Sequence, residues 1–464
     1  MRRIIFLAAL LAGCGHHGPL LVARPAHPAA IVAFHDVAVL DVEHGTREEH
    51  RDVIVRDGKI AAIGATGAPL PAGAKILEGA GLTLLPGLID AHGHLDNGTA
   101  PPWKSELPDS NATMRSFLYC GVTTVFDPAD LDTKAFARRE KVRAGKLIGP
   151  HIFAAGPAFT APGGHPAAML TALLPWFARG YAVRHFTRGV ANAKDATAAV
   201  DALAKQHPDF IKIVVDRIPL TAPRISEEAL NATVAAAKAN GLRAVAHIGS
   251  TDDALAAARA GVAAWIHGVE SERIPDDQIA PLAAFHIPMA PTMVVFENYA
   301  LLGTGPRQST PLEREVASPA LLAAFDNPPT DTPPARLFRS YLLLLREHRL
   351  DWRDNVRRLR AAGVTILAGS DAQPGVFPGP GLHRELHLLT EAGLTPAEAI
   401  RAATIDNAKF LAGTAEPSFG VVAEGKRADL LLVEGDPTAD LDALAKIRAV
   451  MLDGVMLQRH PHGR

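Results

Sequence analysis

The residues best suited to chemistry in this sequence begin with two histidines at the end of an apolar stretch. The stretch runs from Leu84 to Asp90, and His92 and His94 follow it one residue apart. In an extended chain, residues i and i+2 point to the same side, so the two imidazoles would project together. Neutral imidazole is a common metal ligand. The pair therefore indicates either half of a metal site or two surface histidines in a turn.

Four further polar residues lie in or at the end of apolar runs downstream. Lys212 lies inside the run Phe210–Val215, His247 and His267 each close a run, and Asp371 follows another. Taken singly, each has an ordinary explanation. A strand-end histidine can be structural, a lysine can extend its amine to the surface, and an aspartate can cap the next segment. Five strand ends that all carry such residues favour one shared site over five separate coincidences.

The elements that must position these residues alternate between strand and helix. Such alternation predicts a parallel sheet, and eight units over residues 86–415 suit a (β/α)8 TIM-like barrel, whose chemistry lies at the C-terminal ends of the strands. An open doubly wound sheet would instead want a glycine-rich phosphate loop after its first strand, where this chain has His-Gly-His. The expected strands are Leu84–Asp90, Gly121–Phe126, His151–Ala155, Phe210–Val215, Leu242–His247, Val262–His267, Ile287–Pro291 and Val364–Ser370.

Short β-rich segments precede and follow the barrel. Residues 31–85 contain several strands, with Asp57-Gly58 as a hairpin turn signal, and residues 416–464 return to the same pattern. We expect the two ends to meet in one small β-sandwich domain, so that the whole chain is an α/β protein. With 464 residues and a net charge of −2, the composition is globular and gives no attraction to nucleic acid.

Residues 1–30 are expected to be a signal peptide and tether. A basic start is followed by an apolar core from Ile4 to Ala12, too short to span a bilayer as a mature helix. Leu11-Ala12-Gly13-Cys14 resembles the lipobox of bacterial lipoproteins, although an ordinary secretory signal is the alternative. The resemblance implies lipid attachment at Cys14 and anchoring in the cell envelope, facing the periplasm or exterior, with the outer membrane favoured by Gly15. Only Cys120 remains besides Cys14, in an apolar context typical of a buried thiol.

Together these features resemble the amidohydrolase superfamily, in its imidazolonepropionase-like and prolidase-like branch. The resemblance covers nearly the whole mature chain and is more specific than His-x-His alone. Pro86–His94 is similar to the family's first-strand signature and 121–125 to its second strand. Three further stretches are typical of its C-terminal part: 402–408, 424–430 and 450–454.

The resemblance implies a binuclear metal centre. His92, His94 and Asp371 would hold the more buried ion, His247 and His267 the second, and Lys212 would bridge both as a carbamate. A lysine ammonium has only donors and cannot ligate a metal, whereas its carbamate offers two oxygens. The donor set suits zinc, with manganese, iron or cobalt as other options. Two such ions can share a hydroxide, and Asp371 would move its proton to the leaving amine.

Some positions depart from the family pattern or concern the substrate. Ser250 stands where the deaminase branch usually has glutamate, which argues against deamination. Ile266 precedes His267 where many relatives have glutamate, and Asp216-Arg217 replaces small residues after strand four. His165, in the loop after strand three, is expected to face a small-molecule substrate, with an exposed loop histidine as the alternative. Tyr299, Arg217 and Arg184 are candidates for binding a substrate carboxylate.

The expected reaction is hydrolysis of an amide bond in a dipeptide, an N-acyl amino acid or a cyclic amide. One alternative is a lactone or ester hydrolase on the same site. The other is a metal-binding envelope lipoprotein without turnover, against which the complete ligand set with Asp371 argues. The charged region 303–336 is either a lid or a surface insertion, and the sequence leaves the oligomeric state open.

Overall fold

Eight parallel strand segments close into a barrel in the computed structural model, which describes residues 20–101, 103–104, 108–326, 328–329 and 333–462. Isolated bridges join Trp265 to Met289 and Met289 to Ile366, so the seventh and eighth segments are short. The Ala91 amide closes the ring by donating to the Ala368 carbonyl at 2.9 Å. The expected α/β barrel is therefore confirmed. Its longer strands are β7 (Leu88–Asp90), β8 (Val122–Asp127), β9 (His151–Ala154), β12 (Phe210–Val214), β13 (Arg243–His247) and β14 (Ala264–Trp265).

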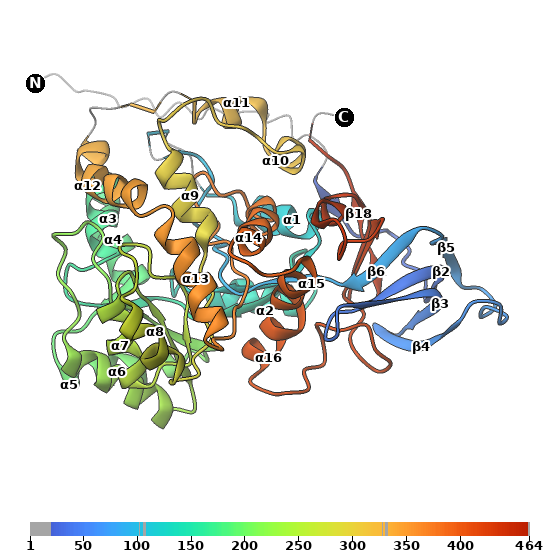
Figure 1. Cartoon of the computed structure of the whole chain (residues 1–464), viewed down its shortest axis with the longest axis horizontal. Coiled ribbons are helices and arrows are strands. Elements are labelled where there is room, and N and C mark those ends of the chain that lie inside the picture. Colours follow the sequence, from blue (N-terminus) through green and yellow to red (C-terminus); the bar gives the residue numbers. More distant parts are fainter. Residues whose placement is uncertain (1–19, 102, 105–107, 327, 330–332, 463–464) are drawn as a thin grey trace, which may run out of the picture.

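Helices surround the barrel (Figure 1) and pack apolar faces on its outside. The helical region between α9 and the eighth strand segment is divided, because prolines begin new helices at Pro311, Pro319 and Pro333. The surrounding helices are α1 (Ser110–Tyr119), α2 (Ala135–Arg143), α5 (Ala193–Ala204), α6 (Glu227–Ala239), α7 (Thr251–Ala260), α8 (Asp276–Ala283), α9 (Met293–Leu301), α13 (Asp351–Ala361), α14 (Pro380–Glu391), α15 (Pro396–Arg401), a π-helical turn (Ala402–Asp406) and α16 (Asn407–Ala412).

Further short elements follow β9 and α9. The strands β10 (Ala158–Thr160) and β11 (Thr187–Gly189) extend the sheet beside β12. Two helices lie between them, α3 (Ala167–Leu173) and α4 (Trp176–Phe186), and three more are α10 (Pro311–Val316), α11 (Pro319–Ala323) and α12 (Pro333–Glu347). Within the described residues, the structure has no helix both long and apolar enough to cross a membrane.

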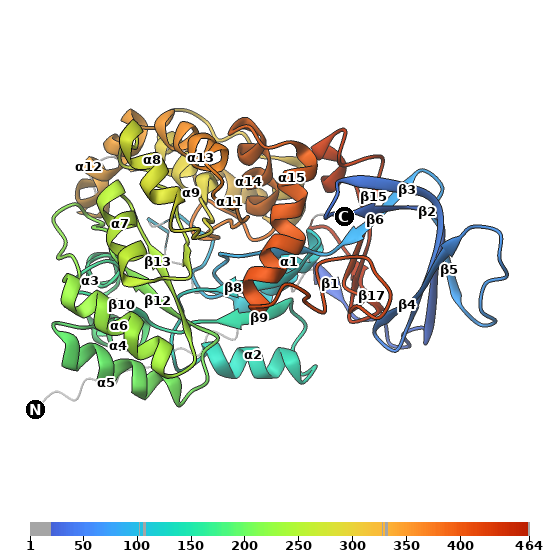
Figure 2. The same ribbon diagram turned by 60° about the horizontal axis from the view of Figure 1, so that its bottom comes forward.

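Both chain ends build the small β domain on one side of the barrel (Figure 2). Strand β6 pairs antiparallel with β15, with Leu85 opposite Leu431, so the two ends share one curled sheet as expected. Asp57 and Gly58 both have positive φ, the conformation of the hairpin turn predicted there. The sheet comprises β2 (Ile31–Asp41), β3 (Thr46–Arg56), β4 (Lys59–Ala65), β5 (Lys75–Glu78), β6 (Leu82–Pro86), β15 (Leu430–Glu434), β16 (Ile447–Leu452) and β17 (Val455–Met456), and a 3-10 turn (Leu441–Ala445) precedes β16.

Part of the expected tether is packed against the folded chain, which corrects that expectation. Strand β1 (Val22–Ala23) pairs antiparallel with β18 (Gln458–Arg459). Leu21 and Val22 are buried in the main core. Because this removes their apolar surface from water, it stabilises the pairing of β1 with β18. Cys14 lies outside the described residues. Cys120 is fully buried at the C-terminal end of α1, as its apolar context predicts.

Candidate metal centre

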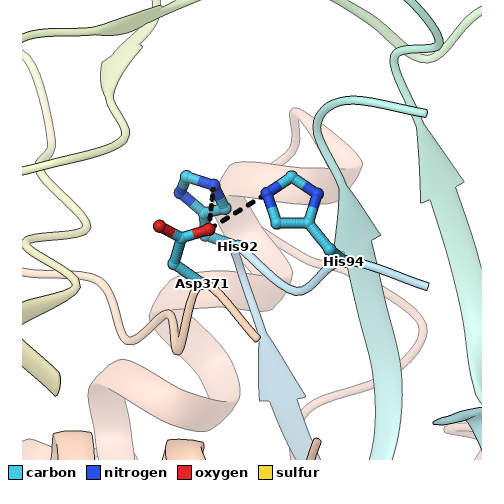
Figure 3. A group of neighbouring side chains, drawn as sticks. All are labelled: His92, His94 and Asp371. Carbon is cyan, nitrogen blue, oxygen red and sulfur yellow. Dashed lines mark ion pairs between the residues drawn. The ribbon is translucent and has the colours of Figure 1, made fainter. Parts of the chain in front are cut away.

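His92, His94 and Asp371 converge at the C-terminal end of the barrel, as the sequence predicts (Figure 3). The two histidines follow β7 and Asp371 follows the eighth strand segment. One carboxylate oxygen of Asp371 lies 3.0 Å from His94 Nε2 and 3.4 Å from His92 Nε2. All three side chains are buried. The spacing places two ring nitrogens and one oxygen close enough to share a single ion.

A buried carboxylate, Asp90, fixes the backbone from which this group projects. Its Oδ1 accepts from the amides of His92 and Ser370, both at 3.0 Å, and its Oδ2 accepts from the Ser370 hydroxyl at 2.5 Å. The His92 Nδ1 lies 2.7 Å from the Ile266 carbonyl, an acceptor, so Nδ1 carries the proton and Nε2 is left as the acceptor. Hydrogen bonds of this kind orient metal-binding histidines.

Asn407 explains why the stretch 402–408 belongs with the site. Its side-chain amide donates to the carbonyls of Ile89 at 2.7 Å and Ala368 at 2.8 Å, and its oxygen accepts from the Ala368 amide at 3.3 Å. The side chain thus joins the first and last barrel segments directly beneath the histidines. The sequence pattern singles out residues 402–408 but does not predict this role for Asn407, because the two strands that Asn407 joins are far apart in the chain.

Lys212, His247 and His267 face the same end of the barrel. Lys212 is 3% exposed in β12, between core residues Ile211 and Ile213. The His267 ring centroid lies 3.8 Å from that of His247 and 4.6 Å from that of His92.

Thr292 holds His267 in place, since its hydroxyl lies 2.7 Å from His267 Nδ1. This buried threonine has φ +50°, which is strained for a β-branched residue. Strain of this kind persists where the surroundings over-determine it, often at functional sites.

The protonation states created by burial fit metal ligation. Burial lowers the pKa of Lys212 to about 7, which makes the neutral amine accessible near neutral pH. Burial also holds the pKa values of His92, His247 and His267 well below the usual range, so these rings are neutral.

The carboxylate of the first group is ionised. Burial opposes ionisation of Asp371, but the imidazoles of His92 and His94 outweigh it and lower its pKa. Burial likewise opposes protonation of His94, yet the carboxylates of Asp127 and Asp371 raise its pKa to about 9. A proton and a metal ion therefore compete for the His94 ring.

His165 and Asp216 form a second group with His247, whose potential ligand atoms all lie within 4.8 Å of one another. The sequence predicted a substrate role for His165 and treated Asp216 only as a departure from the family. Both oxygens of Asp216, His247 Nε2 and His165 Nδ1 are buried without a hydrogen-bond partner. Buried polar atoms without partners are rare. The unpartnered set is what a site built for divalent cations would show.

All the candidate ligands except Asp216 line a cavity of about 750 Å³. Apolar side chains from α3, α9 and α12 also line it, among them Leu173, Phe296 and Phe338. Tyr299 also lines it, whereas Arg184 and Arg217 do not belong to the described lining. From the region 303–336, Gly303, Pro328 and Pro329 reach the cavity, so this insertion contributes to its wall.

The chain belongs to the amidohydrolase family, whose sequence profile matches residues 83–457. It is 26% identical over 400 residues to an imidazolonepropionase of Geobacillus, covering 83% of this chain and 84% of the relative. An uncharacterized protein of Mycobacterium tuberculosis is 26% identical over 376 residues, covering 80% and 84% respectively. The resemblance expected from the motifs is thereby confirmed, and the chain is a hydrolase acting on carbon–nitrogen bonds.

Solved structures confirm the fold. A Xaa-Pro dipeptidase with bound methionine superposes with a TM-score of 0.75 at 23% identity, covering 93% of this chain and all of the dipeptidase. Ochratoxinase of Aspergillus niger superposes with a TM-score of 0.68 at 20% identity, covering 93% and 96%. At 20–23% sequence identity, these structures show that the fold of the barrel and its β domain is shared.

Proposed function

We propose that the protein is a binuclear metal-dependent amidohydrolase. The observation that carries the proposal is the meeting of His92, His94 and Asp371 with Lys212, His247 and His267 on the floor of one cavity. Nitrogen and oxygen donors suit zinc, and also manganese, iron or cobalt. Two bound divalent ions would supply an activated water and polarise the scissile carbonyl.

Asp371 and Lys212 have separate roles in this proposal. Asp371 is ionised and buried, so it can accept a proton from the attacking water and deliver it to the leaving nitrogen. Its second oxygen accepts a hydrogen bond of 2.8 Å from Gln373, which fixes the carboxylate plane. Lys212 would supply two oxygen ligands for the ions if its neutral amine combined with carbon dioxide to give a carbamate and a proton.

The cavity wall favours an amide substrate with an apolar part. Met169, Leu173 and Leu174 face the cavity from the α3 side, and Leu342 and Leu343 from α12. Burying one methylene group contributes about 0.8 kcal/mol, so several such contacts favour a long acyl or aromatic group over a small polar one. N-acyl amino acids and apolar dipeptides fit this wall. Relatives named as a Xaa-Pro dipeptidase and an ochratoxinase are compatible with that class.

The test is a substrate series on purified protein loaded with zinc or manganese. We expect hydrolysis of N-acyl amino acids, with kcat/KM rising with acyl length, and weaker hydrolysis of dipeptides, lactones and esters. Asp371→Asn should lower kcat by about 10³-fold, the middle of the range for loss of a general base. A protein with two bound metals that cleaves no amide in the series would contradict the proposal.

We also propose that the protein is a lipoprotein of the cell envelope, anchored through Cys14. The support is the basic start, the apolar core and the lipobox-like end of residues 1–14. Lipid anchoring would keep the enzyme at a membrane surface, facing the periplasm or exterior.

A further inference from the structure

Asp216, a carboxylate that is not among the metal ligands implied by the family resemblance, lies at the candidate metal centre. Asp216 comes two residues after the end of β12 and is 5% exposed. Its Oδ2 lies 3.0 Å from Nε2 of His247, the ring that closes the next strand, β13. His165, from the loop after β10, faces the same ring at 5.0 Å between centroids. Two loops and one strand end thus bring three potential ligands together.

The contact between Asp216 and His247 is not a hydrogen bond. Although 3.0 Å is within hydrogen-bonding distance, neither Nε2 of His247 nor either oxygen of Asp216 has a hydrogen-bond partner. Leaving a buried carboxylate unpaired costs several kcal/mol. Within the described part of the chain, no arginine or lysine forms an ion pair with Asp216. Among the described residues no donor satisfies the carboxylate, and a bound cation would do so.

We propose that Asp216 and His165 join His247 and His267 as ligands of the second metal ion, beside the group of His92, His94 and Asp371 around the first. This inference rests on the proposed function, because it assigns ligands within the same metal centre. Imidazoles combined with a carboxylate are a common protein ligand set for divalent metals. Lys212 belongs to the same charge cluster, since the charges of Asp371 and Asp216 both oppose the lowering of its pKa by burial.

The alternative is that Asp216 only orients His247. Orienting carboxylates accept from the ring nitrogen that does not bind the metal. Asp216 lies instead beside Nε2, and it forms no hydrogen bond there. The carboxylate and the ring nitrogen are thus placed as two ligands of one ion.

Asp216→Asn with Glu270→Gln as matched control tests the assignment by metal analysis. Glu270 is an equally buried carboxylate near Asp216, because a Cβ on Gly249 would approach both residues. After saturation with manganese and dialysis, the wild type and Glu270→Gln should retain about two ions per chain, and Asp216→Asn about one. His165→Asn should lose the same ion, whereas a residue that only binds substrate would raise KM at full metal content.

A second variant tests directly whether residue 216 binds the metal, without counting the ions that each chain retains. Asp216→Cys places a thiolate at the same position. In the cobalt-loaded protein it should produce a thiolate-to-cobalt charge-transfer band that the wild type lacks, and this band forms only if residue 216 binds the metal.

Two results would overturn the assignment. In one, Asp216→Asn is folded, judged by its circular dichroism spectrum, and keeps two ions. In the other, Asp216→Cys binds cobalt without the band. If both occur while the wild type cleaves amides, only this inference fails. If the wild type retains no metal at all, the proposed function fails with it.

Discussion

At the scale of single residues, the centre depends on a lysine placed where a charged amine is costly. Lys212 is flanked by apolar residues in β12, and burial lowers its pKa to about 7. An ammonium would repel the metal ions that the surrounding rings and carboxylates are placed to bind. Conversion to a carbamate, as we propose, would remove this repulsion and add two oxygen ligands.

Lys212→Ala should therefore abolish amide hydrolysis and lower metal retention after dialysis. The loss follows because the remaining ligands would lack the group that bridges both ions. Metal analysis by mass spectrometry and the acyl amino acid assay measure the two effects. The exposed Lys238→Ala on α6 is the matched control and should leave both unchanged. Retention of both ions and of activity in Lys212→Ala would contradict the carbamate.

At the scale of elements, the positions of the strand ends were predictable and their mutual contacts were not. His92, His247 and Asp371 each close an apolar run, and parallel strands of one barrel end on the same side. That rule predicts one site without any distances. Asp216 and His165 meet only through the paths of two irregular loops, which no periodic pattern encodes. The two shortest strand segments were also predicted, because apolar runs between helices mark them even where few ladder bonds form.

Asn407 should contribute strongly to barrel closure. Asn407→Ala would leave two buried backbone groups, the Ile89 carbonyl and the Ala368 amide, without their side-chain partner, whereas the Ala368 carbonyl keeps its bond from the Ala91 amide. We expect the free energy of unfolding to fall by about 3 kcal/mol. Each unsatisfied buried group costs about 1–3 kcal/mol, and partial relaxation of the structure reduces the total. Urea denaturation measures the change. Asn111→Ala, at an exposed position of α1, should shift it by less than about 0.5 kcal/mol.

Glu385 on α14 should make stability depend on pH. Its Oε2 accepts from the Val294 amide at 2.8 Å at the start of α9, and burial raises its pKa to about 8. Because the folded-state pKa lies above the unfolded value of about 4.3, the folded protein binds more protons between these values. The contribution of Glu385 to stability is therefore complete at low pH and is lost as pH rises toward about 8.

Glu385→Gln keeps the acceptor but cannot ionise. Its melting temperature should fall less than that of the wild type between pH 6 and 8, measured by scanning calorimetry. Glu391→Gln, at the exposed end of the same helix, should keep the wild-type pH dependence. Equal pH slopes for the wild type and Glu385→Gln would show that Glu385 is already ionised in the folded protein.

At the scale of the whole molecule, the β domain and the cavity are built at different places on the barrel. The β domain joins both chain ends beside β6 and β15, whereas the cavity opens at the C-terminal strand ends. Near that opening, α4 exposes two large aromatic side chains, Trp176 at 81% and Phe177 at 71%. They follow directly on α3, whose Leu173 lines the cavity. This places apolar surface next to the route by which an apolar substrate would enter.

The last prediction concerns the location of the whole protein in the cell. If Cys14 carries lipid, Cys14→Ser should move the protein from the membrane fraction to the soluble fraction, since a single residue carries the anchor. Fractionation with immunoblotting measures the distribution, and Cys120→Ser, at the buried thiol, should stay with membranes. Metabolic labelling with a fatty acid should mark the wild type and Cys120→Ser but not Cys14→Ser. Because the lipid acts on location and the metal ligands act on chemistry, the released protein should hydrolyse soluble N-acyl amino acids at the wild-type rate. Continued membrane binding of Cys14→Ser would refute the lipobox.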